Sequence, residues 1–482
     1  MAAAMTAPFV PLAPAGTPAG RGELRPLLAL ATPLVGANLL QMAVYSVDAI
    51  FVARLGTVDF AAATLGVFMF GLSLWALVGL TTVCAALMAA ERGRRMHAVR
   101  EVRRSFRMAL WLAVVAAVPI ILILLQGEAV LRAFGQDAEV ARRAGRFLDI
   151  LWIALLPAVA SAVMRTVAAT LGRPGWALGI TAIGLGLGVL FNWLLVFGHG
   201  GVPALGIVGS AAASVMTSVA MMVAYALVLA FDPKLRRYRL FGRWWRPEWR
   251  RLADIVRLGV PIMLTTTLEA GLFGGAAVLM GLIGVNDVAA HAIALNIAAI
   301  AFQIPLGVSQ AATVRVGLAY GAGDRARVGR AGWTAIAVGT GIMGATAIAL
   351  WAAPRAFIAI YLDPAAPADA AVVALAVRFL GVAAMFQLAD GAQVVTAGVL
   401  RGLQDTRVPM LIAAFGYWVA GFGTAVLLGF RAGWGGVGIW AGLAVGLAVV
   451  AALLLLRWNR RDALGLSPPD RARMSITASA TA

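Results

Sequence analysis

Three carboxylate side chains, Asp48, Glu269 and Asp390, lie inside long apolar stretches of this sequence. An ionised side chain at the centre of a bilayer costs roughly 2.5–3.5 kcal/mol even on a lenient insertion scale. A carboxylate at such a position therefore faces protein or water, and it is a candidate for coupling to a proton or a monovalent cation. Structural hydrogen bonding between helices is the competing interpretation for each acid.

Asp48 ends a polar stripe on the first apolar segment. Asn38, Gln41 and Tyr45 precede it at spacings that put all four side chains on one face of a helix. A polar stripe on an otherwise apolar helix predicts one wall of a wet cavity. Asn192, a lone polar residue in the fifth apolar segment, is a candidate either to complete a site with Asp48 or to bond two helices together.

Glu269 and Asp390 belong to two different apolar segments, the seventh and the tenth. Thr265 lies four residues before Glu269 and Gln387 lies three residues before Asp390, so each acid shares a helix face with a polar neighbour. If the two helices pack together, the acids can hold one proton or one monovalent cation and titrate as a unit. The sequence therefore predicts a cation site, with Na⁺ as one candidate ion, at Glu269 and Asp390.

The eighth segment carries Asn296, Gln303 and Gln310 at seven-residue spacing, which forms one slowly drifting stripe. Cavity lining and hydrogen bonding between helices explain this stripe equally well. We keep Asn296 and Gln303 as candidate cavity residues.

Twelve apolar segments must position these residues. The chain is 62% hydrophobic and only 12% charged, too little charge to coat a water-facing surface of this size. Runs of about 20 apolar residues cross a bilayer as helices, because lipid offers no partner for a bare backbone N–H or C=O. We predict an all-α membrane protein with twelve transmembrane helices near residues 27–51, 60–88, 108–126, 147–170, 176–198, 205–230, 258–284, 288–314, 332–352, 375–400, 408–430 and 436–457.

The net charge of +18 does not indicate nucleic-acid binding, because Arg residues cluster in short stretches between the apolar runs. That placement orients a membrane protein, and most of the 39 Lys and Arg fall on the side of the termini. We therefore expect a multi-pass protein of the cell inner (plasma) membrane with both termini in the cytoplasm, embedded in membrane lipid and monomeric. The sequence contains neither a His-Glu-x-x-His motif nor a Walker phosphate loop. We expect no enzyme and no cofactor beyond a coupling ion, Na⁺ or H⁺.

An internal repeat organises the chain. A shift of 228 residues places Pro33 on Pro261. The same shift superposes Asp59 on Asp287, Gly79 on Gly307, and Gly93 on Gly321. Six helices repeated in the same orientation give two six-helix bundles related by a pseudo-two-fold axis along the membrane normal.

The repeat divides the chain into five predicted parts: a disordered cytoplasmic tail (1–26), an N-terminal six-helix lobe (27–231), a cytoplasmic connector (232–257), a C-terminal six-helix lobe (258–457) and a second cytoplasmic tail (458–482). Trp beside Arg in the connector suits the membrane interface, which predicts an amphipathic segment lying on the bilayer.

The sequence resembles the MATE (multidrug and toxic compound extrusion) family, most closely its NorM-like branch. The motifs that carry this resemblance are Ala31-Thr32-Pro33 with Val47-Asp48, Phe191-Asn192-Trp193, Leu258-Gly259-Val260-Pro261 with Leu268-Glu269, Pro305-Leu306-Gly307, and Phe386-Gln387 with Asp390. The resemblance covers roughly residues 27 to 457. It implies two bundles forming a V-shaped cleft, and export of cationic amphiphilic drugs in exchange for Na⁺ or H⁺.

The resemblance also implies roles for single residues. Asp48 matches the family's first-helix acid, Asn192 matches a residue of the first lobe's ion site, and Glu269 and Asp390 match the acids of the second lobe. Val196 stands where some members carry a further acid, so the choice between Na⁺ and H⁺ stays open.

The alternative function is a related flippase or exporter of a lipid-linked or other endogenous metabolite, which needs a strongly cationic cavity. We expect the two helix-located arginines, Arg165 and Arg378, to be peripheral, which favours cationic cargo. A lipid-modifying enzyme would need His, Asp or Lys converging at one membrane face, and a membrane scaffold would have no use for intramembrane acids.

Overall fold

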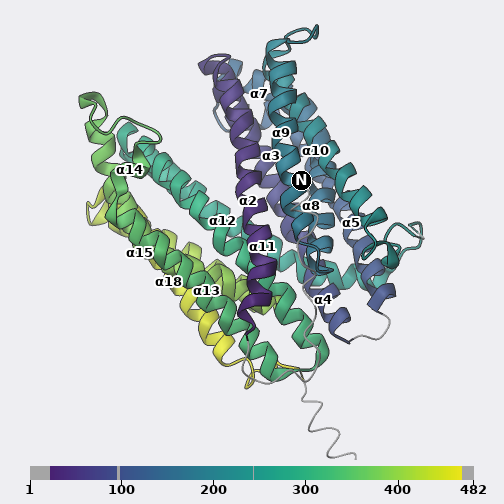
Figure 1. The fold of residues 1–482 in the computed structure, drawn as a ribbon. Helices are drawn as coiled ribbons and strands as arrows, with labels where there is room; N and C mark the ends of the chain where they lie inside the picture. Colours follow the sequence, from purple (N-terminus) through teal and green to yellow (C-terminus); the bar gives the residue numbers. More distant parts are fainter. Residues whose placement is uncertain (1–21, 95–97, 243, 469–482) are drawn as a thin grey trace, which may run out of the picture. The chain divides into compact units, whose positions relative to one another are not determined.

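The computed structural model describes residues 22–94, 98–242 and 244–468. Twelve helical segments in these ranges are long and apolar enough to cross a membrane, and no strand occurs there, so the predicted fold class is confirmed. The first six spans are built from α2 (Leu24–Ala53), α3 (Thr57–Thr82), α4 (Cys84–Arg94), α5 (Ala98–Leu124), α7 (Ala138–Leu151), α8 (Leu155–Thr170), α9 (Gly175–Phe197) and α10 (Gly206–Phe231), with the short α6 (Gly127–Ala133) between α5 and α7 (Figure 1).

The last six spans continue the same all-helical pattern. They are built from α11 (Trp249–Ile283), α12 (Val285–Ala322), α13 (Arg325–Ala352), α15 (Ala370–Gly402), then α16 (Arg407–Ala414), η4 (Phe415–Phe422), α17 (Gly423–Val426) and η5 (Leu427–Arg431) as one span, and α18 (Gly435–Asn459); the short α14 (Pro354–Ile358) follows α13. The segments η4 and η5 are π-helical.

Several helices extend beyond the apolar runs that predicted them. Helix α5 begins at Ala98 instead of residue 108, and α12 ends at Ala322 instead of residue 314. The apolar length matches the hydrocarbon layer, whereas a helix continues into water for as long as its backbone bonds and polar side chains are satisfied. The basic stretch after the second span is therefore largely helical, although it reads as a loop in the sequence.

The chain divides into two compact units, and the first helix of each repeat runs from one unit into the other. Within the described residues, unit 1 comprises 36–91 and 98–263, and unit 2 comprises 22–35, 92–94 and 264–468. Helix α2 changes unit after Val35 and α11 changes unit after Met263. These two positions are 228 residues apart, and each follows a repeat-related proline, Pro33 or Pro261, by two residues.

Ion pairs fix the first turn of each of these helices. Glu23, directly before α2, accepts from Arg327 Nε of α13 at 2.9 Å and from Arg315 Nε of α12 at 3.2 Å, all in unit 2. The Arg315 and Glu23 side chains are almost fully buried. Arg251, in the first turn of α11, stands 228 residues after Glu23, so repeat-equivalent positions carry opposite charges.

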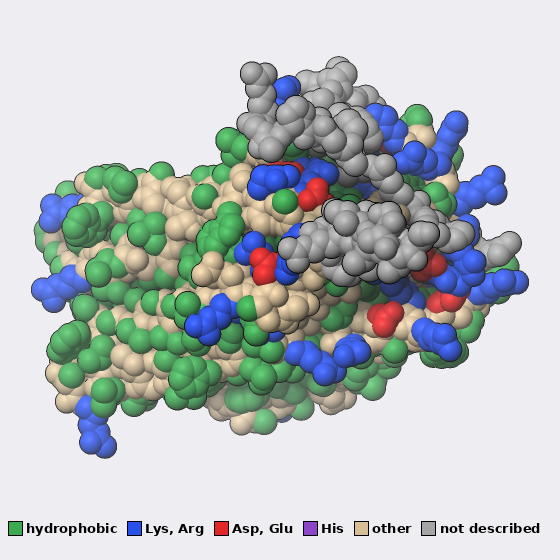
Figure 2. Space-filling model, turned by 90° about the horizontal axis from the view of Figure 1, so that it is seen from below, with side chains coloured by type: hydrophobic (Ala, Val, Ile, Leu, Met, Phe, Trp, Pro, Cys, Tyr) green, Lys and Arg blue, Asp and Glu red, His purple; other side chains and the backbone are tan. Residues whose placement is uncertain are grey.

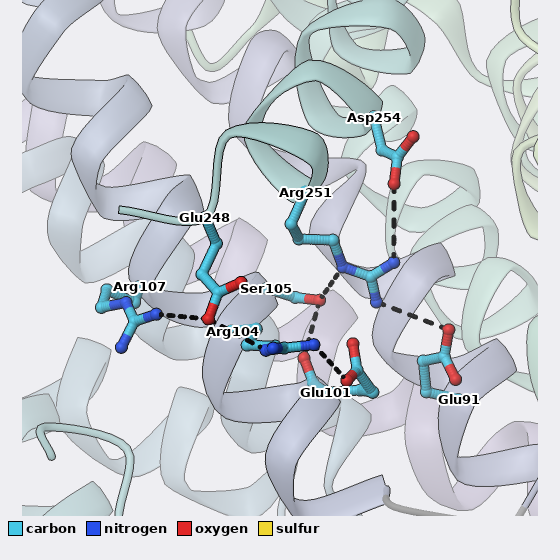
Figure 3. Close-up of polar contacts among 8 residues, drawn as sticks. All are labelled: Glu91, Glu101, Arg104, Ser105, Arg107, Glu248, Arg251 and Asp254. Carbon is cyan, nitrogen blue, oxygen red and sulfur yellow. Dashed lines mark hydrogen bonds and ion pairs between the residues drawn. The ribbon is translucent and has the colours of Figure 1, made fainter. Parts of the chain in front are cut away.

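Figure 3 shows the contacts that hold the start of α11 within unit 1. Arg251 donates from Nε to Ser105 Oγ of α5 at 2.8 Å and lies 3.6 Å from Glu91 Oε1 of α4. Glu248, in the turn before α11, accepts from Arg104 Nε of α5 at 3.1 Å. These contacts connect the beginning of α11 to the last turns of α4 and the first turns of α5.

The stretch between α10 and α11 packs partly on unit 1. Asp232 accepts from Arg173 Nη2 at 2.7 Å and from Trp176 Nε1 at 3.0 Å, and Tyr238 is buried. Residues 232–242 and 244–248 form turns and irregular structure with one short 3₁₀ segment, Arg236–Tyr238. Trp245 in this stretch is 75% exposed. Tyr238 therefore packs on protein, and exposed Trp side chains such as Trp245 remain available as the interfacial anchors that the sequence predicted.

In unit 2, α15 packs against α12, α13 and α18. A Cβ atom at Gly398 of α15 would lie 2.6 Å from the Ser309 carbonyl oxygen of α12, so glycine is required for this close approach. Ser309 Oγ donates to the Val394 carbonyl at 2.7 Å, and Thr313 Oγ1 donates to the Gly398 carbonyl at 2.8 Å. These bonds set the rotation of α15, which carries Asp390.

In Figure 2, Lys and Arg side chains gather mainly in the right half of the view with acidic side chains among them, and green hydrophobic side chains mixed with tan atoms cover most of the left half. This distribution agrees with basic helix ends outside the hydrocarbon layer.

We predict that the Glu23 cluster makes stability depend on pH. Burial raises the pKa of the Glu23 carboxyl, but Arg315 and Arg327 outweigh burial and hold it below its usual value of 4.5. A group with a depressed pKa in the folded protein stabilises above its unfolded value, and this stabilisation is lost as pH falls through the folded value. Glu23→Gln should therefore lower the free energy of unfolding by about 3 kcal/mol near pH 7, because it leaves the buried Arg315 without its charged partner.

The measurement is thermal unfolding in detergent across pH, and the difference between wild type and Glu23→Gln should shrink below about pH 4.5. The control is Asp462→Asn, which removes an exposed pair with Arg325 and should change stability by less than about 1 kcal/mol. A Glu23→Gln difference that stays constant down to pH 3 would contradict the assignment.

Candidate functional site

Unit 1 holds Asp48 of α2 in a network of neutral donors from two other helices. Asn192 Nδ2 of α9 donates to Asp48 Oδ1 at 2.7 Å, and Ser214 Oγ of α10 donates to Asp48 Oδ2 at 2.6 Å. Asn192 is fully buried, and its amide also donates to the Gly188 carbonyl of its own helix at 2.9 Å. Asn192 Oδ1 has no hydrogen-bond partner among the described residues. A carboxylate, an amide N–H and a hydroxyl thus converge at one point.

The rest of the predicted stripe on α2 faces the same side of unit 1. Tyr45 is 42% exposed and is hydrogen-bonded to Gln41, whereas Asn38 is buried. Arg165 of α8, which the sequence placed at the periphery, instead lies with Nη1 3.5 Å from Asn38 Oδ1. That prediction was wrong because the rotation of α8 about its axis, set by packing, turns Arg165 toward α2. Arg378 is exposed, as expected.

Unit 2 brings Glu269 and Asp390 together through one amide. Gln393 Nε2 lies 3.0 Å from Glu269 Oε1 and 3.2 Å from Asp390 Oδ1 and donates to both. Tyr417 Oη donates to Gln393 Oε1 at 2.6 Å and so fixes the orientation of the amide. Asp390, Gln393 and Tyr417 are buried, and Glu269 is partly exposed. The two acids therefore form one coupled site with an accessible side.

The π-helical segment η4 positions Tyr417 over this site. A π-helix is wider than an α-helix and occurs mostly as short insertions that re-aim side chains at functional positions. The neighbouring Trp418 donates from Nε1 to the Leu268 carbonyl at 3.3 Å, directly before Glu269. Two successive residues of η4 thus contact both helices that carry the acids.

None of the three carboxylates forms an ion pair within the described part of the chain, since their hydrogen-bond partners there are neutral. The described residues also contain no group of three or more His, Cys, Asp and Glu side chains that could hold a metal ion. Carboxylate, amide and hydroxyl oxygens suit a hard, weakly held cation or a proton better than a transition metal.

Of the remaining predicted cavity residues, Asn296, Gln303 and Gln387 form no hydrogen bond with the acids in the part of the chain that the structure describes. Asn296 is exposed, and Gln303 Nε2 donates to the Ala299 carbonyl of its own helix at 3.3 Å. Thr265 lies partly buried one turn before Glu269. Gln387 is fully buried one turn before Asp390, and neither end of its amide has a partner among the described residues.

Three residues of these sites escaped the sequence analysis as site residues. Gln393 follows Asp390 by three residues on the same helix face, and that spacing could have identified it. Ser214 is one small residue in a helix rich in Ala and Ser, and Tyr417 depends on a π-helix, so neither carries a sequence signal.

Two stretches of the chain, residues 33–194 and 261–427, match the family model described as MatE. The chain belongs to the MatE family. The two matched stretches begin at Pro33 and Pro261, which the 228-residue shift superposes. Each half of this MatE protein is thus one copy of the same repeat.

Curated relatives match this MatE chain over nearly its whole length. A protein of Mesorhizobium japonicum named probable multidrug resistance protein NorM is 47% identical over 449 residues, covering 93% of this chain and 96% of that protein. A protein of Burkholderia vietnamiensis named multidrug resistance protein NorM is 36% identical over 441 residues, covering 91% and 94%.

Solved MATE structures share the fold. A multidrug resistance MATE family transporter of the MOP superfamily, solved in an outward-facing conformation, superposes with a TM-score of 0.81 at 21% identity, covering 92% of this chain and 97% of that one. The eukaryotic MATE transporter AtDTX14 superposes with a TM-score of 0.80 at 20% identity, covering 90% and 94%. The MatE chain is a multi-pass membrane protein of a transporter family.

We predict opposite outcomes for two buried glutamines of α15. Gln393→Leu removes the donor to Glu269 and Asp390 and leaves the Tyr417 hydroxyl unpaired, so it should lower the free energy of unfolding by about 1–3 kcal/mol. Gln387→Leu replaces an amide that has no partner among the described residues and should be nearly neutral or stabilising. Thermal unfolding of both variants in one detergent checks this, and equal destabilisation would contradict it.

Proposed function

We propose that this chain is a secondary active multidrug efflux transporter that exchanges Na⁺ or H⁺ for cationic amphiphilic organic compounds. The relatives named multidrug resistance protein support multidrug efflux, because the chain covers nearly all of their length. The proposal places the protein in the cell inner membrane with both termini in the cytoplasm, as the asymmetry of Lys and Arg predicts.

The observation that carries this proposal is the pair of Glu269, which is partly exposed, and Asp390, which is buried. Within a membrane-spanning unit the two acids are hydrogen-bonded only to one neutral amide among the described residues. Two carboxylates this close repel each other when both are ionised in a medium of low dielectric constant. A proton or a monovalent cation relieves the repulsion. Arg401 attracts Glu269 electrostatically, but no ion pair to either acid is formed within the described residues. The pair can therefore bind and release one proton or one monovalent cation.

Asp48 provides a second ion site in unit 1. Its two oxygens accept from Asn192 and Ser214, which stabilises the ionised form without neutralising it. Asn192 Oδ1 is an unused acceptor that can complete the coordination of a cation. Sites in both units allow ion binding to favour one conformation of the transporter, because a ligand shifts a conformational equilibrium only through its differential affinity for the two states.

One ion per cycle supplies enough free energy to export a neutral cargo. A monovalent cation moving down 100 mV releases about 2.3 kcal/mol. At about 1.4 kcal/mol per tenfold, this sustains roughly a 50-fold gradient of a neutral solute. Exchange of one ion for one monovalent cationic cargo moves no net charge, so in that case the concentration gradient of the ion supplies the free energy, about 1.4 kcal/mol for each tenfold ratio.

We predict that neutralising the acids abolishes coupled transport. In proteoliposomes loaded with a fluorescent organic cation, wild type should move the probe under an imposed Na⁺ or pH gradient, and the gradient that works identifies the ion. Asp48→Asn, Glu269→Gln and Asp390→Asn should each reduce gradient-driven flux at least tenfold, because the variants cannot exchange the coupling charge.

Asp462→Asn is the matched control, because it neutralises an exposed acid paired with Arg325 outside the membrane spans. It should retain wild-type flux. Full flux from a variant carrying all three neutral substitutions would refute the antiport mechanism.

If Na⁺ is the ion, we predict saturable stabilisation of the folded protein. A ligand that binds only the folded state adds about 2.7 kcal/mol at 100 times its Kd. The thermal unfolding midpoint should rise when choline is replaced by Na⁺ at constant ionic strength, and Asp390→Asn should remove most of this rise. An equal rise of the unfolding midpoint in Asp390→Asn would show that the stabilising Na⁺ does not bind at Asp390.

A further inference from the structure

The stretch between α10 and α11 forms a surface where three membrane spans of unit 1 begin or end. The spans of α5 and α11 begin there, and the span of α10 ends there. Leu235, Tyr238 and Leu240 of this stretch are buried in one apolar cluster with Phe106 of α5 and Ile255 of α11. The exposed side chains between these buried residues are therefore carried on a backbone that is anchored in the core.

Five arginines gather on this surface, and we call them the η2 basic patch. They come from the first turns of α5 and from the 3₁₀ segment η2 (Arg236–Tyr238) with the residue after it: Arg100, Arg103, Arg236, Arg237 and Arg239. Gly242 connects the two groups, because its N–H donates to the Arg239 carbonyl at 3.0 Å and a Cβ atom there would lie 3.8 Å from Arg103 Nη1. Arg103 is partly exposed and the other four are exposed.

No acid neutralises the η2 basic patch within the part of the chain that the structure describes. Each acid of the stretch and of α5 is paired with another arginine: Glu101 with Arg104, Glu248 with Arg104 and Arg107 (Figure 3), and Asp232 with Arg173. The five arginines form no ion pair of their own among the described residues. The patch therefore carries positive charge that the protein leaves uncompensated, and it attracts anions.

Exposed aromatic side chains flank the patch. Phe241 packs edge-on against Phe106 of α5, with ring centroids 5.6 Å apart, and is 40% exposed. Phe231, the last residue of α10, is 74% exposed, and Trp249, the first residue of α11, is 67% exposed. Aromatic rings beside basic residues at the ends of membrane spans are typical of the headgroup layer of a bilayer. The anion that the patch attracts is therefore expected in that layer.

We propose that the η2 basic patch binds the phosphodiester headgroup of an anionic phospholipid in the adjoining leaflet. Guanidinium groups bind phosphate oxygens with charge-assisted and often bidentate hydrogen bonds. An acidic protein or a nucleic acid offers the same charge, but neither explains why the arginines and exposed rings lie together at the ends of three membrane spans. The inference goes beyond the proposed efflux function and requires only that the protein spans a membrane.

Arg239 allows the charge of the patch to be separated from folding. Its backbone has φ 43° and ψ 52°, in the left-handed region that residues with a Cβ atom rarely adopt. Glycine adopts this conformation without a steric cost. Arg239→Gly should therefore remove one charge of the patch without lowering the thermal unfolding midpoint in a neutral detergent.

The test measures lipid binding next to the patch in the full-length protein. A fluorophore is attached to Ala253→Cys, an exposed position in the first turns of α11, while the native Cys84 is fully buried and does not react. Phosphatidylcholine nanodiscs receive increasing amounts of phosphatidylglycerol, or of further phosphatidylcholine, with a nitroxide quencher on the acyl chain. Phosphatidylglycerol should reach half-maximal quenching at a mole fraction at least tenfold lower than phosphatidylcholine does.

The patch variant combines Arg100→Gln, Arg236→Gln and Arg239→Gly. Each basic residue near an anionic membrane surface contributes roughly fivefold to binding. The variant should therefore raise the half-maximal mole fraction of phosphatidylglycerol at least tenfold and leave that of phosphatidylcholine unchanged. The matched control carries Arg355→Gln, Arg378→Gln and Arg431→Gln, which remove three exposed arginines of unit 2, and it should behave as wild type.

Equal quenching by the two lipids in wild type would overturn the proposal, as would an unchanged midpoint in the patch variant or an equal rise in the control variant. Relief of quenching by soluble polyglutamate at a comparable concentration of charge would assign the patch to an acidic protein and also overturn it. Arg239→Gly alone should show part of the loss at an unchanged unfolding midpoint, so that misfolding cannot account for the result. Gradient-driven flux in proteoliposomes tests the efflux function separately.

Discussion

A carboxylate in a medium without water must be stabilised by the protein, and this requirement shapes both units. The Asp48 oxygens are held by side chains from α9 and α10, and Glu269 and Asp390 share one amide that is itself oriented from η4. Each site therefore needs three packed elements. A helix that rotated by a fraction of a turn would leave an acid without donors, at a cost of several kcal/mol. The close glycine contacts and the inter-helix hydroxyl bonds of α12 and α15 are what hold those rotations.

The two repeats meet this requirement with different residues. Glu269 stands at the repeat position of Gln41, and Asp48 stands at that of Ala276, so neither acid has an acidic counterpart in the other half. Unit 1 combines one acid with neutral donors and a distant arginine, whereas unit 2 combines two acids with one amide. The repeat preserved the backbone arrangement while the two sites diverged, so only the site in unit 2 presents two acids that share one donor.

The helices that begin each repeat carry a related constraint. Each changes unit two residues after a proline, and a proline removes a backbone hydrogen bond and bends its helix at that point. Ion pairs hold the first turns at Glu23 and Arg251, in unit 2 and unit 1 respectively. The two equivalent positions carry opposite charges, so their contacts are not interchangeable. An acid in place of Arg251 would face Glu91, and a base in place of Glu23 would face Arg315.

The sequence alone determined the class of protein and the residues that needed explanation. Three features can be read from the sequence without knowing how the helices pack: the twelve apolar runs, the 228-residue repeat and the three acids inside apolar runs. They are sufficient to predict that the chain spans a membrane. Gln393 could also have been predicted as a site residue from its spacing, since it follows Asp390 by three residues on the same helix face. Only the tertiary structure decided that Asn192 and Ser214 meet at Asp48, that Tyr417 reaches Gln393 through a π-helix, and that Arg165 faces Asn38. Those contacts depend on how far each helix is rotated about its axis, and that rotation is set by side-chain packing among helices distant in the sequence.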